Sequence, residues 1–310
     1  SLIRFNEITK RYADNLALKN LNLTIESGEL FVLVGPSGSG KTTLLKMINR
    51  LNDPSQGTVE IDEVDVRQMD IQKSRQNIGY VLQDSALFPN MTVAQNAAIQ
   101  LEAQGWDLNK RIDGVSELMK LVGLNPDICL HKMPSELSGG EAQRIGIVRA
   151  LCSSPDIVLM DEPFSALDPI SKRQLQDLVL KLHKELGTTF VFVTHDMQEA
   201  IKIADRMAII HNGQLQQVGT TREILANPKN EFVKKFFEDD HEQAHFLGSV
   251  LSKGFGEVYT ADAEVMQTTD TIFQWADRIK LDAEKLINVE GHILTSEDLV
   301  VYLASLKEVE

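Results

Sequence analysis

The stretch Gly35-Pro36-Ser37-Gly38-Ser39-Gly40-Lys41-Thr42-Thr43 decides the fold of this 310-residue chain. It follows the continuously apolar run Leu30–Val34 and precedes residues 44–48, which have the composition of a helix. The stretch fits the phosphate-loop pattern of a glycine, four residues and Gly-Lys-Ser/Thr, in the strand–loop–helix context that the pattern requires. Glycines let the backbone wrap closely around an anion, and the loop amides and the helix start point at it. The sequence therefore predicts a site for a nucleoside triphosphate.

The residues of this loop are expected to have different roles. Lys41 is predicted to reach the β- and γ-phosphates, and the Thr42 hydroxyl to bind Mg²⁺. The remaining residues, from Gly35 to Thr43, are predicted to line the phosphates with their backbone. ATP and Mg²⁺ are the cofactors that this pattern indicates.

Two acidic residues close a second apolar run. Residues 157–160 are continuously apolar, as in a buried parallel strand, and Asp161 and Glu162 follow directly. We expect Asp161 to hold Mg²⁺, directly or through water, and Glu162 to polarise the attacking water. Phosphoryl transfer to water needs this division between a metal ligand and a group that orients the nucleophile.

Apolar runs alternate with helical patterns along most of the chain, which predicts an α/β sheet with the nucleotide at the carboxyl ends of its strands. The expected strands cover residues 2–9, 16–25, 58–66, 77–82, 157–160 and 188–193. The expected helices cover residues 93–122, 139–152, 169–186 and 197–204. Asn212-Gly213 between two short apolar runs is a strong hairpin signal.

Composition limits the other possibilities. The net charge of −14 argues against binding nucleic acid through a basic surface. Two cysteines are too few for a disulfide framework. No apolar run approaches the roughly 18–20 residues that span a bilayer.

From His241 onward the chain has 13 acidic and 5 basic residues, so we predict a domain boundary there, with domains at residues 1–240 and 241–310.

The segment Leu137-Ser138-Gly139-Gly140-Glu141 resembles the signature motif of ATP-binding-cassette (ABC) ATPases. It precedes the strand that ends in Asp161, as in that family, and the resemblance covers about residues 2–238. The fold that it implies is an α/β phosphate-loop ABC ATPase domain, with a RecA-like core, an antiparallel β subdomain and a helical subdomain. A small α+β extension would follow it.

The resemblance also implies roles for four further residues. Tyr12 would stack on adenine, and Gln83 would contact Mg²⁺ and the attacking water. His195 would hold the γ-phosphate, and Asp168 would lie in the loop that joins two active sites across a dimer. The implied catalytic residues are Glu162, His195, Gln83 and Lys41, and the implied metal-binding residues are Thr42, Gln83 and Asp161.

The signature motif implies a head-to-tail homodimer. Ser138 and the amides of Gly139 and Gly140 would start a helix and form an anion site. In the family this site meets the γ-phosphate bound to the other subunit, so that ATP closes the dimer and hydrolysis reopens it. Ala142 departs from the family, which commonly has glutamine there, and we expect altered helix contacts without loss of activity.

The family resemblance implies partners in a membrane. A chain with one cassette would work with integral membrane permease subunits, at the cytoplasmic face, and indirectly with an extracytoplasmic solute-binding protein. Residues 84–93 resemble the region where a permease docks. From the sequence, Leu87-Phe88-Pro89 fits an apolar contact with such a partner and local core packing equally well.

Closer resemblance, at residues 46–51, 159–170 and 192–197, is to the importer ATPases for the osmoprotectants glycine betaine, carnitine, choline and proline. The alternatives are an importer ATPase for amino acids or another polar solute, and a soluble ABC ATPase without a transport role.

In the tail, residues 268–306 resemble a single degenerate cystathionine-β-synthase (CBS) repeat, with a helix at 271–279, a strand pair at 286–294 and a helix that starts at 295–299. This tail is either a dimerising or ionic-strength-sensing module or an inert appendage.

Overall fold

The chain forms two compact units in a computed structural model, Ser1–Lys229 and Asn230–Glu310. The structure describes residues 1–13, 15–238, 247–252, 254–258, 261–268, 270–282 and 284–307. The domain boundary predicted after Asp240 lies outside the described residues. Helix α10 (Glu231–Glu238), which the sequence places before that boundary, groups with the second unit.

A six-stranded sheet is the centre of the first unit, with the strand order β10–β9–β3–β8–β7–β6. Its strands are β3 (Leu30–Val34), β6 (Ile78–Val81), β7 (Ile157–Asp161), β8 (Thr189–Thr194), β9 (Arg206–His211) and β10 (Gln214–Gly219). All neighbours are parallel except β9 and β10, which form the hairpin predicted at Asn212-Gly213. Every residue of β3, β7 and β8 is buried, as the continuous apolar runs predict. The carboxyl ends of β3, β6, β7 and β8 therefore meet at one edge.

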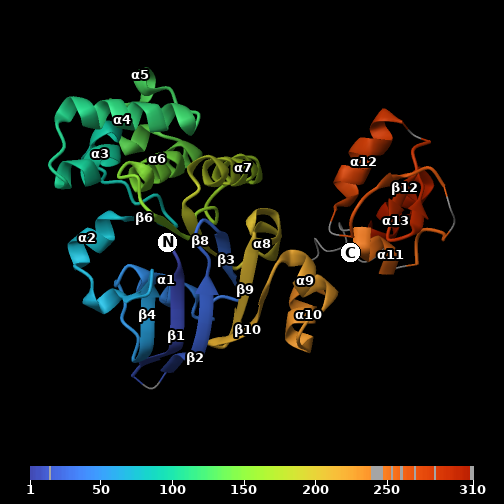
Figure 1. Ribbon diagram of the computed structural model, residues 1–310. Coiled ribbons are helices and arrows are strands. Elements are labelled where there is room, and N and C mark those ends of the chain that lie inside the picture. The colour runs from blue at the N-terminus through green and yellow to red at the C-terminus, as the bar shows by residue number, and fades with distance from the viewer. Residues whose placement is uncertain are drawn as a thin grey trace. The chain divides into compact units, whose positions relative to one another are not determined.

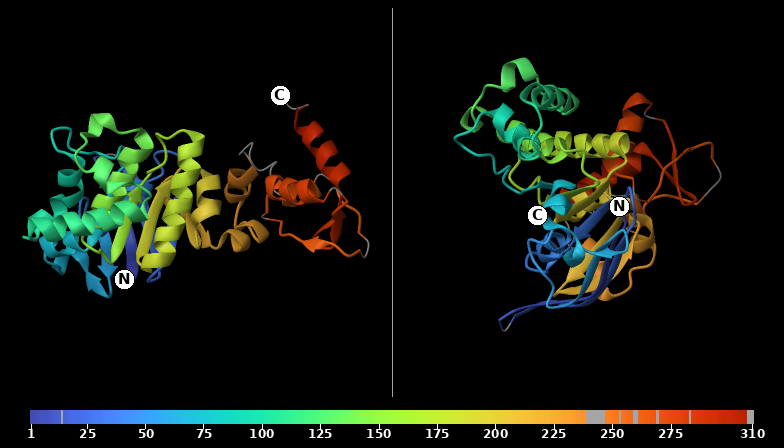
Figure 2. Two further views of the ribbon diagram at one scale, coloured as in Figure 1. Left: turned by 90° about the horizontal axis from the view of Figure 1, so that it is seen from above. Right: turned by 60° about the vertical axis from the view of Figure 1, so that its left-hand side comes forward.

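A second sheet of four antiparallel strands has the order β2–β1–β4–β5. Its strands are β1 (Ile3–Tyr12), β2 (Asn15–Ile25), β4 (Gln56–Ile61) and β5 (Val64–Asp65). The β1–β2 hairpin projects from this sheet (Figure 2, right). The single strand predicted over residues 58–66 is wrong, because Asp62 and Glu63 adopt positive φ and turn the chain back on itself.

Helix α1 (Lys41–Ile48) connects the two sheets through one hydrophobic core. Leu44, Leu45 and Ile48 of this helix are fully buried in a cluster that includes Phe5 of β1 and Leu159 of β7. The helix that follows the phosphate loop is thus fixed from both sides. This packing holds the loop at the carboxyl end of β3.

The helical part of the first unit lies apart from the antiparallel sheet (Figure 1). It consists of α3 (Val93–Ala103), α4 (Leu108–Leu121), α5 (Pro126–Cys129) and α6 (Gly139–Leu151). The helical pattern predicted from residue 93 to about residue 122 is confirmed. It forms two helices rather than one continuous helix, because Gly105 adopts a φ of 76° after α3 and Asp107 caps a new helix. The other helices of this unit are α2 (Ile71–Gln76), α7 (Pro169–Leu186), α8 (Met197–Ile203) and α9 (Thr221–Ala226), with short 3₁₀ turns at Val66–Gln68 and Pro134–Glu136.

The second unit has its own sheet and core. Its further elements are α11 (Leu247–Ser252), β11 (Glu264–Val265), α12 (Ile272–Leu281), β12 (Ile287–Val289), β13 (His292–Leu294) and α13 (Ser296–Lys307). β11 pairs parallel to β12, and β12 pairs antiparallel to β13. Trp275 and Tyr302 are fully buried in its core. The predicted helix, strand pair and following helix of the tail are confirmed.

Candidate nucleotide site

The phosphate loop has a backbone that only glycine can supply at two positions. A Cβ atom at Gly35 would lie 2.0 Å from the carbonyl oxygen of Ile210. Gly40 has a φ of 104°, and a Cβ atom there would lie 2.7 Å from Leu18 Cδ2. Ser39 Oγ is buried and has no hydrogen-bond partner within the described part of the chain. A buried hydroxyl without a partner in a glycine loop fits a phosphate oxygen as its acceptor.

Lys41 lies inside this loop. Its Nζ donates hydrogen bonds to the carbonyl oxygens of Gly35 at 2.7 Å and Pro36 at 2.9 Å. Burial lowers the pKa of Lys41, and the nearby carboxylates of Glu162 and Asp161 offset this only in part. The ammonium group is thus held among the loop carbonyls, on the side of the acidic pair.

The carboxylate of Asp161 is the meeting point of three elements. Thr42 Oγ1, at the start of α1, donates a hydrogen bond to Asp161 Oδ1 at 2.7 Å. On the other oxygen, Tyr80 Oη of β6 donates at 3.1 Å, and Lys46 Nζ of α1 lies 4.0 Å away. Burial raises the pKa of Tyr80, and Asp161 raises it further, so the phenol remains a donor.

The predicted Mg²⁺ ligands Thr42 and Asp161 are therefore in contact. Hydroxyl and carboxylate oxygens are the ligand types that Mg²⁺ prefers, with waters and nucleotide phosphates completing its shell. Within the described residues there is no group of three or more His, Cys, Asp or Glu side chains that could hold a metal by themselves. The donor set thus fits a metal that the protein and a nucleotide share.

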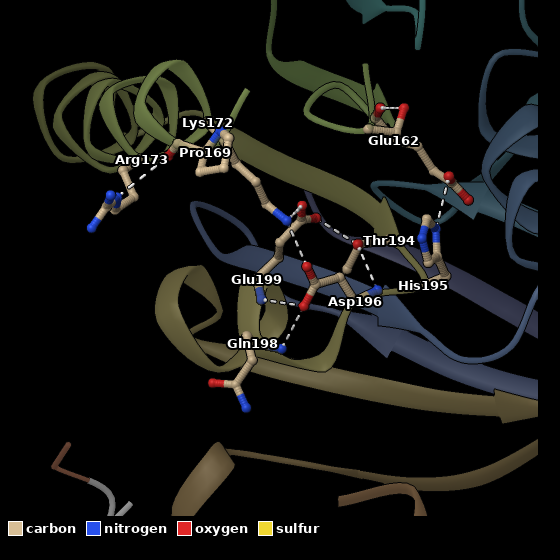
Figure 3. A network of polar contacts seen from close by, with 10 residues as sticks. Glu162, Pro169, Lys172, Arg173, Thr194, His195, Asp196, Gln198 and Glu199 are labelled. Carbon is tan, nitrogen blue, oxygen red and sulfur yellow. Dashed lines mark hydrogen bonds and ion pairs between the residues drawn. The ribbon is translucent and has the colours of Figure 1, made fainter. Parts of the chain in front are cut away.

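Glu162 and His195 face each other across the ends of β7 and β8 (Figure 3). His195 Nδ1 lies 3.0 Å from Glu162 Oε2. The backbone amide of Glu162 donates to the carbonyl of Val193 at 3.0 Å, which fixes the loop after β7 against β8. Gln83 is exposed two residues after Val81, whose strand partner is Met160, so it follows the neighbouring strand end.

Tyr12 lies at the end of β1, away from these groups. Its side chain is 46% exposed, and Asn52 Nδ2 donates a hydrogen bond to its hydroxyl. Lys10 Nζ lies 4.8 Å from the ring centroid. The exposed ring is compatible with stacking on a base, and its role as an adenine contact stays a prediction.

The predicted signature residues form the start of α6. Ser138 Oγ accepts a hydrogen bond from the Glu141 amide at 3.2 Å, and Glu141 Oε2 accepts one from the Ser138 amide at 2.8 Å. This capping box lowers the pKa of Glu141. A Cβ atom on Gly139 or Gly140 would contact Leu167 or Ser171, respectively, so the start of α6 packs beside the start of α7.

Asp168 caps α7. Its Oδ1 accepts hydrogen bonds from the amides of Ile170 and Ser171, each at 3.0 Å. Hydrogen bonds from the hydroxyl and amide of Ser171 lower the pKa of this exposed carboxyl.

The predicted site residues fall into two sets in the structure. The contacts described above bring together Lys41, Thr42, Asp161, Glu162 and His195. Tyr12, Ser138 and Asp168 make none of the contacts described for that group.

Comparison with known proteins decides the family. A family model described as ABC transporter matches residues 18–165. The glycine betaine uptake system ATP-binding protein YehX of Escherichia coli (strain K12) is 39% identical over 236 residues, which cover 76% of this chain and 76% of that protein. The chain belongs to the ABC transporter family. A dimeric post-hydrolysis structure of the ATP-binding cassette MJ0796 bound to ADP and Pi matches 70% of this chain and 98% of that chain, with a TM-score of 0.63 and 33% identity.

Other ABC transporter relatives are longer. The glycine betaine/carnitine/choline transport ATP-binding protein OpuCA of Bacillus subtilis (strain 168) is 47% identical over 236 residues, which cover 76% of this chain and 62% of that protein. The chain thus spans about three fifths of the length of this relative. In the part of the chain that the structure describes, no helix has both the length and the apolar character to cross a bilayer.

Sequence reasoning missed two residues of this ABC site. Lys46 lies one helical turn after Thr42, and that spacing places both on one face of α1. Tyr80 is recognised only once β6 is known to lie beside β7, because its partner Asp161 is 81 residues away in sequence. The first signal was present in the sequence, whereas the second depends on the sheet topology.

Proposed function

We propose that this chain is the ATP-hydrolysing motor subunit of an importer for quaternary-amine osmoprotectants such as glycine betaine, carnitine, choline or proline. The observation that carries the hydrolytic part is the Glu162–His195 pair, which lies at the strand ends beside the Thr42–Asp161 contact. Membership in the ABC transporter family supports the transport part.

The described geometry supports a division of roles at this site. Lys41 and the loop amides would bind the ATP phosphates. Thr42 and Asp161 would hold Mg²⁺, with Gln83 as the further ligand that the family resemblance implies, and the metal would neutralise phosphate charge. Glu162 accepts a hydrogen bond from the attacking water and orients it in line with the γ-phosphate. His195 donates to a γ-phosphate oxygen, and its contact with Glu162 keeps both groups facing the same point.

The solute proposal depends on the relatives. OpuCA is named for glycine betaine, carnitine and choline transport, and YehX for glycine betaine uptake. The second candidate is an importer ATPase for amino acids or another polar solute, which would use the same hydrolytic site. A soluble ABC ATPase without a permease is the third, and the exposed apolar loop described below argues against it.

We infer a head-to-tail homodimer for the working motor. Ser138 and Gly139 are exposed at the start of α6, where helix amides can bind an anion from outside the chain. The matched MJ0796 structure is dimeric and contains ADP and Pi. In such a dimer the start of α6 and the nearby Asp168 loop would meet the ATP held by the partner's phosphate loop.

The loop after β6 supports a contact with membrane permease subunits at the cytoplasmic face. Asn96 is fully buried and hydrogen-bonds the backbone of Phe88 and Met91. Arg149 donates to the carbonyls of Ser85 and Ala86. With its backbone fixed from two helices, the loop presents Phe88 with 45% of its surface exposed. An exposed aromatic side chain on a hydrogen-bonded loop is typical of a protein interface. The extracytoplasmic solute-binding protein would act through that permease.

For the tail we propose a regulatory or dimerising module, residues 241–310. Its support is a core of its own around Trp275 and Tyr302, and the element order α12–β12–β13–α13 on which the resemblance to a CBS repeat rests. The full chain and a chain that ends at residue 240 are compared for ATP hydrolysis between low and high salt. A changed salt response supports a regulatory module, and an identical response in both chains favours an inert appendage.

Uptake of labelled glycine betaine tests the proposed function. Cells with and without this gene, lacking other betaine carriers, are compared at low and high osmolarity. We expect osmotically stimulated uptake to be lost without the gene and restored by the wild type but not by Glu162→Gln. Unchanged betaine uptake, with lost uptake of an amino acid, would move the solute to the second candidate class.

A further inference from the structure

His195 and Asp196 are adjacent in sequence but point in opposite directions (Figure 3). His195 faces Glu162, while Asp196 faces the first turn of α7, where Lys172 Nζ contacts Asp196 Oδ2 at 2.6 Å. The same ammonium group contacts Glu199 Oε1 of α8 at 2.8 Å. One lysine thus connects α7 to the residue that follows His195.

The network continues to the residue before His195. Thr194 Oγ1 donates a hydrogen bond to Glu199 Oε2 at 2.5 Å and accepts one from the Asp196 amide at 3.0 Å. Asp196 Oδ1 accepts from the amides of Gln198 and Glu199 and so caps α8. Both chain neighbours of His195 are therefore fixed by one hydrogen-bonded group, and His195 itself is left to face the nucleotide site.

Burial makes this group sensitive to its charges. Glu199 is 4% exposed, and burial raises its pKa despite its contact with Lys172. For Lys172, burial alone would lower the pKa, but the hydrogen bonds to Asp196 and Glu199 outweigh burial and raise it. Three charged groups and one hydroxyl satisfy one another here, and removal of the lysine would leave two carboxylates without their cation.

Lys172 also lies next to the loop predicted to cross the dimer. It is four residues after Asp168, and its amide donates to the Asp168 carbonyl at 2.9 Å in the first turn of α7. A shift of the Asp168 loop would move the start of α7, and the Lys172 contacts would carry that shift to Asp196. Small displacements of a catalytic group have large effects on rate.

We propose that Lys172 is a positioning residue for ATP hydrolysis, which couples the Asp168 loop to His195 through Asp196 and Glu199. This inference rests on the proposed hydrolytic role of His195. It adds a residue that touches neither the nucleotide loop nor Glu162 in the described contacts. The ammonium group sets where His195 stands relative to Glu162 and does not itself react.

The same two helices provide a matched control. Lys202 Nζ of α8 contacts Asp177 Oδ1 of α7 at 2.7 Å, in a more exposed pair farther along both helices. Lys202→Met therefore removes an α7–α8 ion pair of similar length without touching the neighbours of His195. A general loss of α7–α8 attachment would affect both lysine variants, whereas a positioning effect is confined to Lys172.

Steady-state ATP hydrolysis by the purified full chain tests the proposal. We expect Lys172→Met to lower kcat about 10-fold or more with KM for ATP within about 2-fold. Lys172→Arg should recover most of kcat, and Lys202→Met should match the wild type. Added to His195→Ala, Lys172→Met should cause no further loss, since both act through one group.

A stability control separates positioning from folding. Lys172→Met leaves the buried Glu199 carboxylate without its cation, and adding Glu199→Gln removes that charge. Most of the thermal stability should therefore return in the double variant, while kcat stays low. Recovery of kcat with stability would overturn the proposal, as would a wild-type kcat in Lys172→Met or an equal loss in Lys202→Met. A wild-type kcat in His195→Ala would instead contradict the proposed function of His195, and this result is distinct from the others.

Discussion

Thr42 and Asp161 are separated by 119 residues in sequence, and their side chains share a hydrogen bond of 2.7 Å. The contact exists because α1 packs under β7 and directs its first turn toward the carboxyl end of that strand. It joins the phosphate loop to the acidic pair at the point where Mg²⁺ would be shared between them.

Thr42→Val keeps the shape of the side chain and removes its hydroxyl. We expect Mg²⁺-dependent ATP hydrolysis to fall about 10- to 100-fold, because the metal loses one protein ligand. The measurement is a Mg²⁺ titration of the hydrolysis rate at saturating ATP. An unchanged midpoint and maximum in Thr42→Val would contradict this assignment.

Gly40→Ala tests the shape of the phosphate loop. Alanine at a φ of 104° is strained by about 1–2 kcal/mol, and its Cβ would press on Leu18. We expect ATP binding, followed by titration calorimetry, to be lost. Gly187→Ala is the control, because Gly187 also has a positive φ, of 63°, but an added Cβ atom there would have open space around it. That variant should lose about 1 kcal/mol of unfolding free energy and bind ATP normally.

The Lys172 network predicts a pH-dependent stability. The pKa of Glu199 is raised in the folded chain, so protonation favours the folded state, and this contribution is lost as pH rises through the raised value. In Lys172→Met the uncompensated charge of Glu199 should lower the free energy of unfolding by about 3 kcal/mol at pH 8. The loss should shrink as pH falls toward the ordinary glutamate pKa, because protonation of Glu199 removes the uncompensated charge.

Urea unfolding of the wild type and of Lys172→Met at several pH values measures this difference. A loss of stability that is the same at pH 5 and pH 8 would show that Glu199 is not the group responsible. The double variant with Glu199→Gln should remove the pH dependence of the difference.

Phe88→Ser should separate hydrolysis from transport. The side chain is not part of the nucleotide site, so we expect ATP hydrolysis by the isolated chain to be unchanged. Solute uptake in cells should fall because the permease contact loses its aromatic side chain. Val64→Ser on β5 is the matched control, since Val64 is 44% exposed and Phe88 is 45% exposed. Equal uptake in both variants would place the permease contact elsewhere.

Much of the site could be predicted from the sequence because its residues follow buried strands directly. The apolar runs before Gly35 and Asp161 place both at strand ends, and a parallel sheet brings such ends to one edge. The role of His195 came from the family resemblance, and its position after β8 beside Glu162 agrees with it. Local patterns are sufficient to place such residues at strand ends, whereas the role of His195 also required the family resemblance.

The remaining features depend on conformation or on distant partners. The turn at Asp62 has no glycine to mark it, and the break at Gly105 interrupts a continuous helical pattern. Lys172 reads as an ordinary charged residue on a helix surface, and only the packing of α7 beside α8 reveals its two carboxylate partners. No spacing in the sequence connects it to residues 24 and 27 positions away.

Hydrolysis by Glu162→Gln is the most direct test of the account. The wild type and this variant are compared for ATP turnover, and their masses with ATP and Mg²⁺ are measured by light scattering. We predict that the variant binds ATP, hydrolyses it at least about 100-fold more slowly, and forms more dimers with ATP than without it. Turnover at the wild-type rate by Glu162→Gln would contradict the account, because the group proposed to orient the attacking water would then be dispensable.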